Sequence, residues 1–243
     1  MRTKELFGNK DDITSDDILP YTTDEGMRYY LPNVPHLRSR ARLLGQFARG
    51  LEKAYNGSIA QLIDSSCDKD GDLRAFNNGN GIVERLADEE TFGQAYADHS
   101  VIDGMSVNYL KLAQLTPLLI HGRALTSNGE IPTLADIDKL GTINDYQIPR
   151  SHRLMGTIVL SRELSQKIDT WKLIPRDSRM ENELRLASAA ATSMIKYRIN
   201  DIRAQNNLAP ITIAPLDAWQ WFMGRELDKE NAIYPHRTTT TAY

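Results

Sequence analysis

Two acidic residues stand where a carboxylate could take part in catalysis. Asp145 lies in residues 143–149 (INDYQIP), between two predicted helices, and loops of this kind often present catalytic groups. Asp217 lies in the first turn of another predicted helix, close to Trp219 and Trp221. Both acids also have a structural interpretation, because carboxylates favour turns and complement the dipole at the start of a helix. Spacing by itself favours these structural roles.

The remaining residues of reactive type show no recognised pattern. The segment 68–72 (DKDGD) resembles the start of a calcium loop, but Leu73 replaces the turn glycine and Gly79 the closing glutamate, so we predict a surface loop. Cys67 borders this acidic segment, which raises the expected pKa of its thiol and argues against a nucleophile. The histidines are scattered: His36, His99, His121, His152 and His236. We therefore predict neither a metal site nor a cofactor.

Composition narrows the class of protein. The chain has 243 residues, 41% of them hydrophobic, and 29 basic against 32 acidic residues give a net charge of −3. This balance disfavours a broad surface for nucleic acid, so we expect no direct nucleic-acid binding. The single cysteine fits a reducing compartment. Mean hydropathy is −0.45, and neither a membrane helix nor a signal peptide is recognisable. We expect a cytoplasmic protein that does not contact a membrane.

The periodicity of apolar residues predicts a mainly α fold with a minor β-hairpin. We expect one helical domain over residues 36–243, preceded by an irregular segment with short helices over residues 1–35. The longest predicted helix covers 179–206 and begins with a capping box, Ser178 to Glu181. Pro215 occupies the first turn of the helix predicted over 216–227.

Shorter elements fill the rest of the predicted chain. Apolar spacing and cap residues predict helices at 36–56, 58–65, 82–87, 91–97, 107–125 (kinked at Pro117) and within 133–141, one after Pro149 and one near Arg162. Extended segments are predicted at 27–31, 157–160 and 211–213. Helices and strands do not alternate, so a parallel sheet is not expected.

Four segments of the chain occur together in one known family. They are residues 109–114 (YLKLAQ), 145–149 (DYQIP), 177–185 (DSRMENELR) and 216–221 (LDAWQW), the last followed by Pro235-His236-Arg237 and Tyr243. In this order they resemble the queuosine salvage family, the queuosine 5′-phosphate N-glycosylases. Weaker similarity extends back to about Leu31. No single segment is specific, and it is their shared order and gaps that carry the resemblance.

The resemblance implies a helical fold similar to that of DNA glycosylases and cleavage of the bond between ribose and a 7-deazaguanine base. Breaking that bond builds positive oxocarbenium character on the sugar, which a nearby carboxylate stabilises. A deazapurine is a poor leaving group because it lacks the ring nitrogen that purine-cleaving enzymes protonate. The resemblance implies that Asp145 is the nucleophile or stabilising acid, and that Asp217 holds the base or ribose.

The same resemblance implies further substrate contacts. Ile143 and Asn144 match pocket residues that precede the catalytic acid, and Lys111 matches a basic position that pairs with a carboxylate or with the 5′-phosphate. Trp219 and Trp221 match positions able to stack on the base, although tryptophans at helical spacing more often belong to a core. The other substrate-binding candidates are Tyr146, His236 and Arg237.

The chain also departs from the family pattern. Family members begin with a longer segment that lines the pocket, which leaves four alternatives here: the pocket is open, it is repurposed for a different nucleotide, it is completed by a partner chain or a second copy, or it is inactive. Ala218 stands for a family tyrosine and Phe222 for an aspartate. Beside a hydrolase of a small nucleotide, the sequence leaves open a non-catalytic protein that binds nucleosides or deazapurines. A helical nucleic-acid binder is a third alternative, disfavoured by the near-neutral charge.

Overall fold

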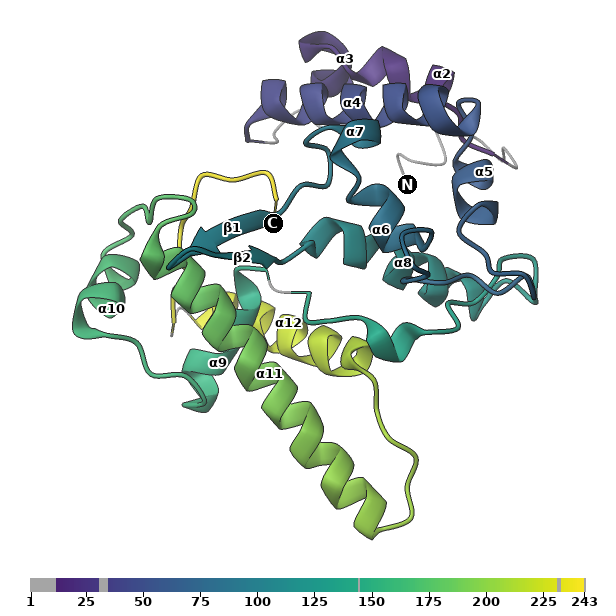
Figure 1. Cartoon of the computed structure of the whole chain (residues 1–243). Coiled ribbons are helices and arrows are strands. Elements are labelled where there is room, and N and C mark those ends of the chain that lie inside the picture. Colours follow the sequence, from purple (N-terminus) through teal and green to yellow (C-terminus); the bar gives the residue numbers. More distant parts are fainter. Residues whose placement is uncertain (1–11, 31–34, 144, 231–232, 243) are drawn as a thin grey trace. The chain divides into compact units, whose positions relative to one another are not determined.

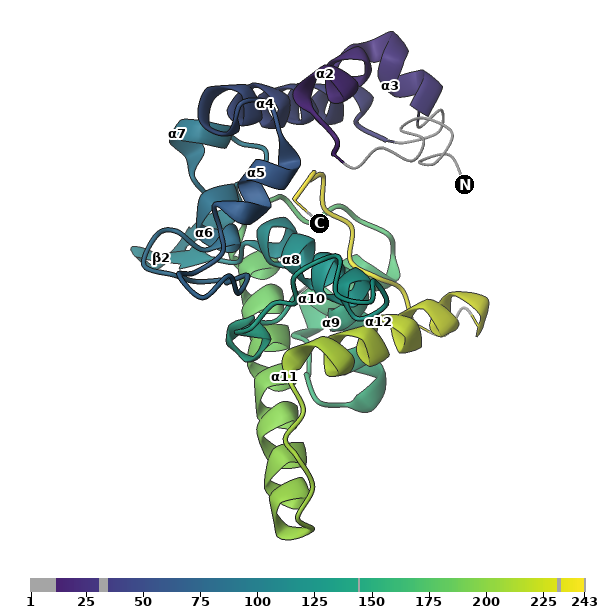
Figure 2. The same cartoon turned by 90° about the vertical axis from the view of Figure 1, so that its right-hand side faces the viewer.

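The computed structural model describes residues 12–30, 35–143, 145–230 and 233–242 (Figures 1 and 2). It confirms a mainly helical protein with one small antiparallel sheet in the described part of the chain. The chain forms two compact units. The first comprises residues 1–97 and 116–136, and the second comprises residues 98–115 and 137–243. The division into 1–35 and 36–243 and the likeness to DNA glycosylases stay predictions.

The first unit is built around one long helix. Its helices are α2 (Ser15–Ile18), the 3-10 turn η1 (Leu19–Tyr21), α3 (Asp24–Tyr30), α4 (Leu37–Tyr55), α5 (Ile59–Asp64), α6 (Ile82–Leu86) and α7 (Glu89–Phe92). Phe92 of α7 stacks on Phe47 and Tyr55 of α4, with ring centroids 5.5 and 6.0 Å apart. A Cβ on Gly50 would come within 2.3 Å of the Phe92 ring, so glycine is what allows α7 to pack this closely.

The extended segment predicted at 27–31 is wrong over its described residues. Residues 24–30 form α3 instead, while Leu31 lies outside the described ranges. Thr23 Oγ1 accepts a hydrogen bond from Gly26 N, and Asp24 and Glu25 occupy the first turn. Met27 is 3% exposed, and α3 packs against α4. Burial of one apolar face against α4 outweighs the strand propensity of the tyrosines.

The hairpin of the second unit lies in a segment for which no strand was predicted. β1 (His99–Ile102) pairs antiparallel with β2 (Met105–Asn108), and Ser100 stands opposite Val107. Asp103 and Gly104 connect the strands with φ angles of 49° and 81°, as a tight hairpin turn requires. The strands predicted at 157–160 and 211–213 are wrong, because neither segment pairs with a strand. β2 also shortens the helix predicted from Val107, since α8 covers Lys111–Ala124.

Three helices of the second unit position the two candidate acids. The unit continues with η2 (Ile137–Lys139), α9 (Gln147–Met155), α10 (Arg162–Asp169), α11 (Arg179–Gln205) and α12 (Ile213–Glu230). α9 packs against both α11 and α12 (Figures 1 and 2). α9 begins at Gln147, earlier than predicted, because Pro149 is tolerated in the first turn, where its missing N–H is not needed. Gly224 of α12 approaches Gln147 so closely that an added Cβ would lie 2.9 Å from its carbonyl oxygen.

The long helix α11 starts as its sequence predicts. Ser178 Oγ accepts a hydrogen bond from Glu181 N, and the Glu181 carboxylate accepts one from Asp177 N. Leu184 of α11 belongs to an apolar cluster of buried residues, together with Leu164, Ile168 and Ile174. None of the helices in the described ranges combines the length and the apolar character that crossing a bilayer requires.

Candidate functional site

Asp145 is buried between α9 and α12. It is 9% exposed and lies two residues before Gln147, the first residue of α9. Its Oδ1 accepts a hydrogen bond from Gln147 N at 2.7 Å, and its Oδ2 accepts one from Trp221 Nε1 at 2.9 Å. Burial raises the pKa of this carboxyl, while both N–H donors and the positive charge of Lys111 act in the opposite direction. Two donors from different elements thus fix both oxygens.

Asp217 is the second buried acid, 8% exposed in the first turns of α12. Its Oδ1 accepts a hydrogen bond from Ile143 N at 3.2 Å, which ties α12 to the segment that carries Asp145. Burial, followed by the negative charge of Asp145, raises the pKa of Asp217 to about 7. The two carboxyl groups therefore interact, although they lie far apart in the sequence.

Lys111, the first residue of α8, supplies positive charge to both acids. Burial lowers the pKa of its ammonium group, whereas Asp145, Asp217 and Asp98 raise it. In return, its charge lowers the pKa of both Asp145 and Asp217. The site therefore combines two carboxyl groups with one ammonium group in a poorly hydrated environment.

A buried ion pair anchors the backbone of Lys111. Asp98 Oδ2 accepts a hydrogen bond from Lys111 N at 3.1 Å. Asp98 also accepts two bonds from the Arg185 guanidinium, at 2.8 and 2.7 Å, and both side chains are 4% exposed. The guanidinium stacks on the Tyr109 ring at 3.7 Å. Sequence reasoning missed this pair; the available signal was Arg185 on the face of α11 that also carries Glu181 and Leu184.

The structure brings together five of the residues that the sequence singled out. Asp145 and Asp217 interact electrostatically with each other and with Lys111. Asp217 also accepts a hydrogen bond from Ile143 N, and Asp145 accepts one from the indole of Trp221. Trp221 is half-buried, one turn after Asp217 on the same side of α12. These five residues form the candidate site.

Other candidates lie outside this group. Trp219 is 52% exposed and stands about 200° around α12 from Asp217, so it faces another direction. Tyr146 is 39% exposed beside Asp145. Their roles in substrate binding stay predictions. Asn144 lies outside the described residues.

His236 and Arg237 belong to the C-terminal segment. His236 is 6% exposed, and burial together with the positive charge of Arg185 lowers its pKa to about 4. The exposed Arg237 donates to Trp171 O at 3.1 Å and lies over the Trp171 ring at 5.5 Å. Its carbonyl oxygen accepts a hydrogen bond from Ile174 N. The described contacts of Arg237 thus anchor the C-terminal segment, and a substrate contact of either residue stays a prediction.

The acidic segment of the first unit is a surface loop, as predicted. Asp68 Oδ1 accepts hydrogen bonds from the backbone N–H groups of Asp70 and Asp72, and its Oδ2 accepts one from Arg74. This carboxylate therefore stabilises its own turn. Burial, and then nearby acids including Asp68, raise the pKa of Cys67, which agrees with the expectation of an unreactive thiol.

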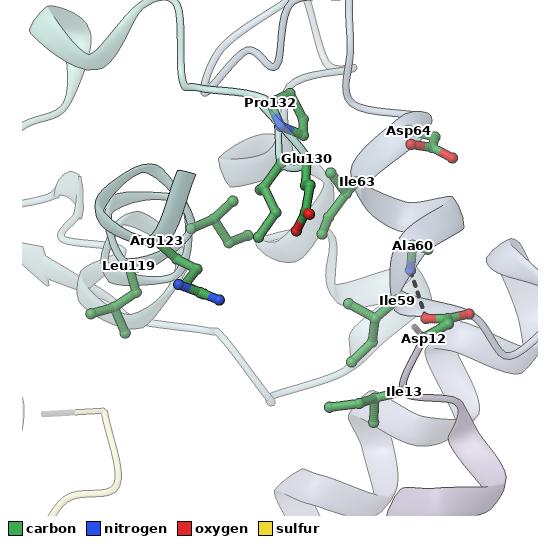
Figure 3. A pocket seen from close by; sticks show the side chains of 12 residues that line it. Asp12, Ile13, Ile59, Ala60, Ile63, Asp64, Leu119, Arg123, Glu130 and Pro132 are labelled. Carbon is green, nitrogen blue, oxygen red and sulfur yellow. Dashed lines mark hydrogen bonds between the residues drawn. The ribbon is translucent and has the colours of Figure 1, made fainter. Parts of the chain in front are cut away.

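A separate cavity of about 890 Å³ lies within the first unit (Figure 3). Ile59 and Ile63 of α5 and Leu119 of α8 contribute apolar walls, and Arg123 and Glu130 add charges. All of its lining residues belong to the first unit, and none was predicted as a site residue. The cavity is therefore distinct from the acid pair.

The environments of the two acids suit cleavage of a glycosidic bond. A pKa of about 7 allows Asp217 to carry a proton near neutrality, while Asp145 has two N–H donors that stabilise its ionised form. Glycosidases commonly use two carboxyl groups whose environments give them different pKa values. The arrangement can hold one negative charge and one transferable proton side by side.

Comparison with known proteins agrees with this chemistry. The family model described as "Queuosine salvage protein" matches residues 8–243. A queuosine 5′-phosphate N-glycosylase/hydrolase of Dictyostelium discoideum is 25% identical over 239 residues, and the match covers 98% of this chain and 68% of the relative. Relatives with the same name from Nematostella vectensis and Schizosaccharomyces pombe are 24% and 26% identical, with 86% and 79% of this chain covered.

The chain is shorter than these relatives. It spans 59% of the length of the Nematostella vectensis protein and 50% of that of the Schizosaccharomyces pombe protein. The family match nevertheless includes both buried acids and extends over nearly every residue. The chain therefore belongs to the queuosine salvage protein family.

Proposed function

We propose that this chain hydrolyses the N-glycosidic bond of queuosine 5′-phosphate and releases queuine, the free base. The named activity of its relatives supports this substrate. The observation that carries the proposal is the buried pair Asp145 and Asp217, in which the charge of one acid raises the pKa of the other. A protein that only binds a nucleoside has no need for this costly arrangement, because burying two interacting carboxyl groups destabilises the fold.

Asp145 is the ionised acid in this mechanism. Gln147 N and Trp221 Nε1 hold its carboxylate in one orientation, and Lys111 balances its charge. As the C1′–N bond lengthens, its electron pair moves to the base nitrogen and positive charge grows on the ribose ring. The Asp145 carboxylate stabilises that charge, or bonds to C1′ until water replaces it.

Asp217 is the protonated acid. Its pKa of about 7 keeps the proton on the carboxyl group through the weakly acidic range. In the reaction this proton goes to the departing base, and the water that adds to C1′ returns a proton to the site. The balance is one water consumed, with ribose 5-phosphate and the neutral base released; the base carries the transferred hydrogen on the nitrogen that was bonded to C1′. Because a deazapurine is a poor leaving group, protonation of the departing base by Asp217 assists cleavage of the bond.

The decisive experiment is to incubate purified protein with queuosine 5′-phosphate and to measure free queuine by mass spectrometry. We expect release by the wild type, and a loss of at least about 10³-fold in kcat for Asp145→Asn. Asp201→Asn is the matched control, since it makes the same chemical change on the exposed part of α11. Absence of release by the wild type, or full activity of Asp145→Asn, would refute the proposed function.

The pH profile tests the division of roles. Activity should rise with pH as the first acid of the pair ionises, and it should fall as the second loses its proton near pH 7. The expected profile of kcat/KM against pH is bell-shaped, with both limbs belonging to the coupled pair. A profile that stays flat from pH 6 to pH 9 would contradict the role of protonated Asp217.

We also propose that the enzyme binds a second copy of itself or a partner chain, and that it is located in the cytoplasm. Trp219 and Phe222 are exposed on a side of α12 that differs from the side of Asp217, and this apolar surface supports covering of α12 by a second copy or a partner chain. Light scattering that finds only monomer at every concentration at which the protein is fully active would exclude the second copy.

The single free Cys67 supports a cytoplasmic location, which fractionation of the host cell checks.

A further inference from the structure

Three fully buried polar side chains join the helices that carry the two acids. His152 of α9, Thr192 of α11 and Gln220 of α12 are each 0% exposed. Thr192 Oγ1 lies 2.8 Å from His152 Nε2 and donates to Gln220 Oε1 at 3.1 Å, and Gln220 Nε2 lies 3.3 Å from His152 Nε2. We call these three residues the polar triangle.

The corners of the triangle are themselves held in place. His152 Nδ1 lies 2.7 Å from Thr157 Oγ1, so both ring nitrogens have a hydroxyl partner. Burial lowers the pKa of His152 to about 4, so the ring is neutral near pH 7. The adjacent Ser151 Oγ lies 2.5 Å from the backbone oxygen of Gln220. α9 and α12 are therefore connected through both the side chain and the backbone of Gln220.

Each helix in the triangle carries part of the candidate site. Gln220 lies one turn after Asp217 and directly before Trp221 on α12. α9 begins with Gln147, whose N–H holds Asp145. A slide of α12 along α9 by one residue would displace Asp217 and Trp221 by about 1.5 Å relative to Asp145. Errors of this size commonly cost about 10²-fold in rate.

Polar bonds fix the register of these helices more strictly than apolar packing would. Apolar side chains resist overlap but tolerate small slides, whereas buried hydrogen bonds are directional and costly to leave unmade. We propose that His152, Thr192 and Gln220 are positioning residues that hold Asp217 and Trp221 in register with Asp145. This inference rests on the proposed function, because it assigns the triangle to the same acid pair.

The test compares two variants of one residue. Thr192→Val removes the hydroxyl group and keeps the branched shape, while Thr192→Ser keeps the hydroxyl and removes the methyl group. Both cost stability, the first through unmade hydrogen bonds and the second through a small cavity. We expect Thr192→Val to lower kcat about tenfold or more with KM changed less than about twofold. Thr192→Ser should retain the wild-type kcat.

One further measurement and one control variant separate positioning from stability and from the proposed function. The indole N–H of Trp221 gives one of three tryptophan signals in a ¹H–¹⁵N spectrum. Its position should change in Thr192→Val and not in Thr192→Ser. Ser188→Ala is the matched control, because Ser188 is equally buried on α11 and its hydroxyl bonds within that helix, to Leu184 O, while only its backbone, which the substitution keeps, bonds to His152.

The outcomes are distinct. Equal kcat values and equal Trp221 signals for Thr192→Val and wild type would overturn the positioning role, as would equal losses in both Thr192 variants. A wild type that releases no base would refute the proposed function. In that case the Trp221 signal alone still decides whether the triangle sets the position of Trp221 against Asp145.

Discussion

The indole N–H of Trp221 donates to Asp145 Oδ2 at 2.9 Å, across 76 residues of sequence. Because Trp221 is one turn from Asp217, this bond makes α12 the support of both acids. The tryptophan in this position orients the carboxylate and also lowers its pKa. This role differs from stacking on the base, which the sequence suggested for both tryptophans.

Replacing Trp221 by phenylalanine keeps an aromatic ring and removes the donor. We expect kcat to fall about 10- to 100-fold, because Asp145 loses one of the N–H groups that orient it. The acidic limb of the pH profile should move to higher pH, since the indole N–H favours the ionised carboxylate. Steady-state kinetics from pH 4 to pH 9 measure both effects. Trp171→Phe, outside the candidate site, should leave the limb unchanged.

Removing the charge of Lys111 should shift the whole pH profile. Its ammonium group lowers the pKa of Asp145 and of Asp217, so Lys111→Met raises both. We expect both limbs of the kcat/KM profile to move to higher pH. Lys172→Met, which removes an exposed lysine, is the control. If both limbs stay at the same pH, the charge of Lys111 does not lower the pKa of the two acids.

Asp217→Asn should stabilise the protein at alkaline pH. The pKa of this acid is about 7 in the folded chain and near 3.8 in an unfolded one, so the folded state binds more protons between these values. Its stability therefore falls as pH rises through this window. We expect the variant to exceed the wild type by at most about 4 kcal/mol at pH 8, and to match it at pH 4. Urea unfolding at both pH values measures the difference.

Breaking the ion pair between Arg185 and Asp98 should destabilise the second unit strongly. Arg185→Met leaves the Asp98 carboxylate buried without its partner, which typically costs about 3–5 kcal/mol. Asp98→Asn in the same chain should recover part of this loss. Arg198→Met breaks an exposed pair with Asp201 and should cost less than about 1 kcal/mol. Urea unfolding of the four proteins provides the comparison.

Local features of the sequence were enough to predict several elements. α11 follows from the capping residues Ser178 and Glu181 and from apolar residues at helical spacing, all within one segment. The same holds for α4, which begins and ends within one residue of its predicted range. A minor hairpin was predicted, but its position was missed because its turn signal, Asp103-Gly104, is short and its strands are only four residues long.

The order of the four sequence motifs was enough to predict a helical chain of the queuosine salvage type with Asp145 and Asp217 as candidate acids. Which groups surround these acids became known from the packing of the folded chain. Arg185 reaches Asp98 across 87 residues and Trp221 reaches Asp145 across 76. No local pattern encodes such contacts, because the first depends on how α11 packs against β1 and the second on how α9 packs against α12. The same packing excludes water from the acids and raises the pKa of Asp217 to about 7.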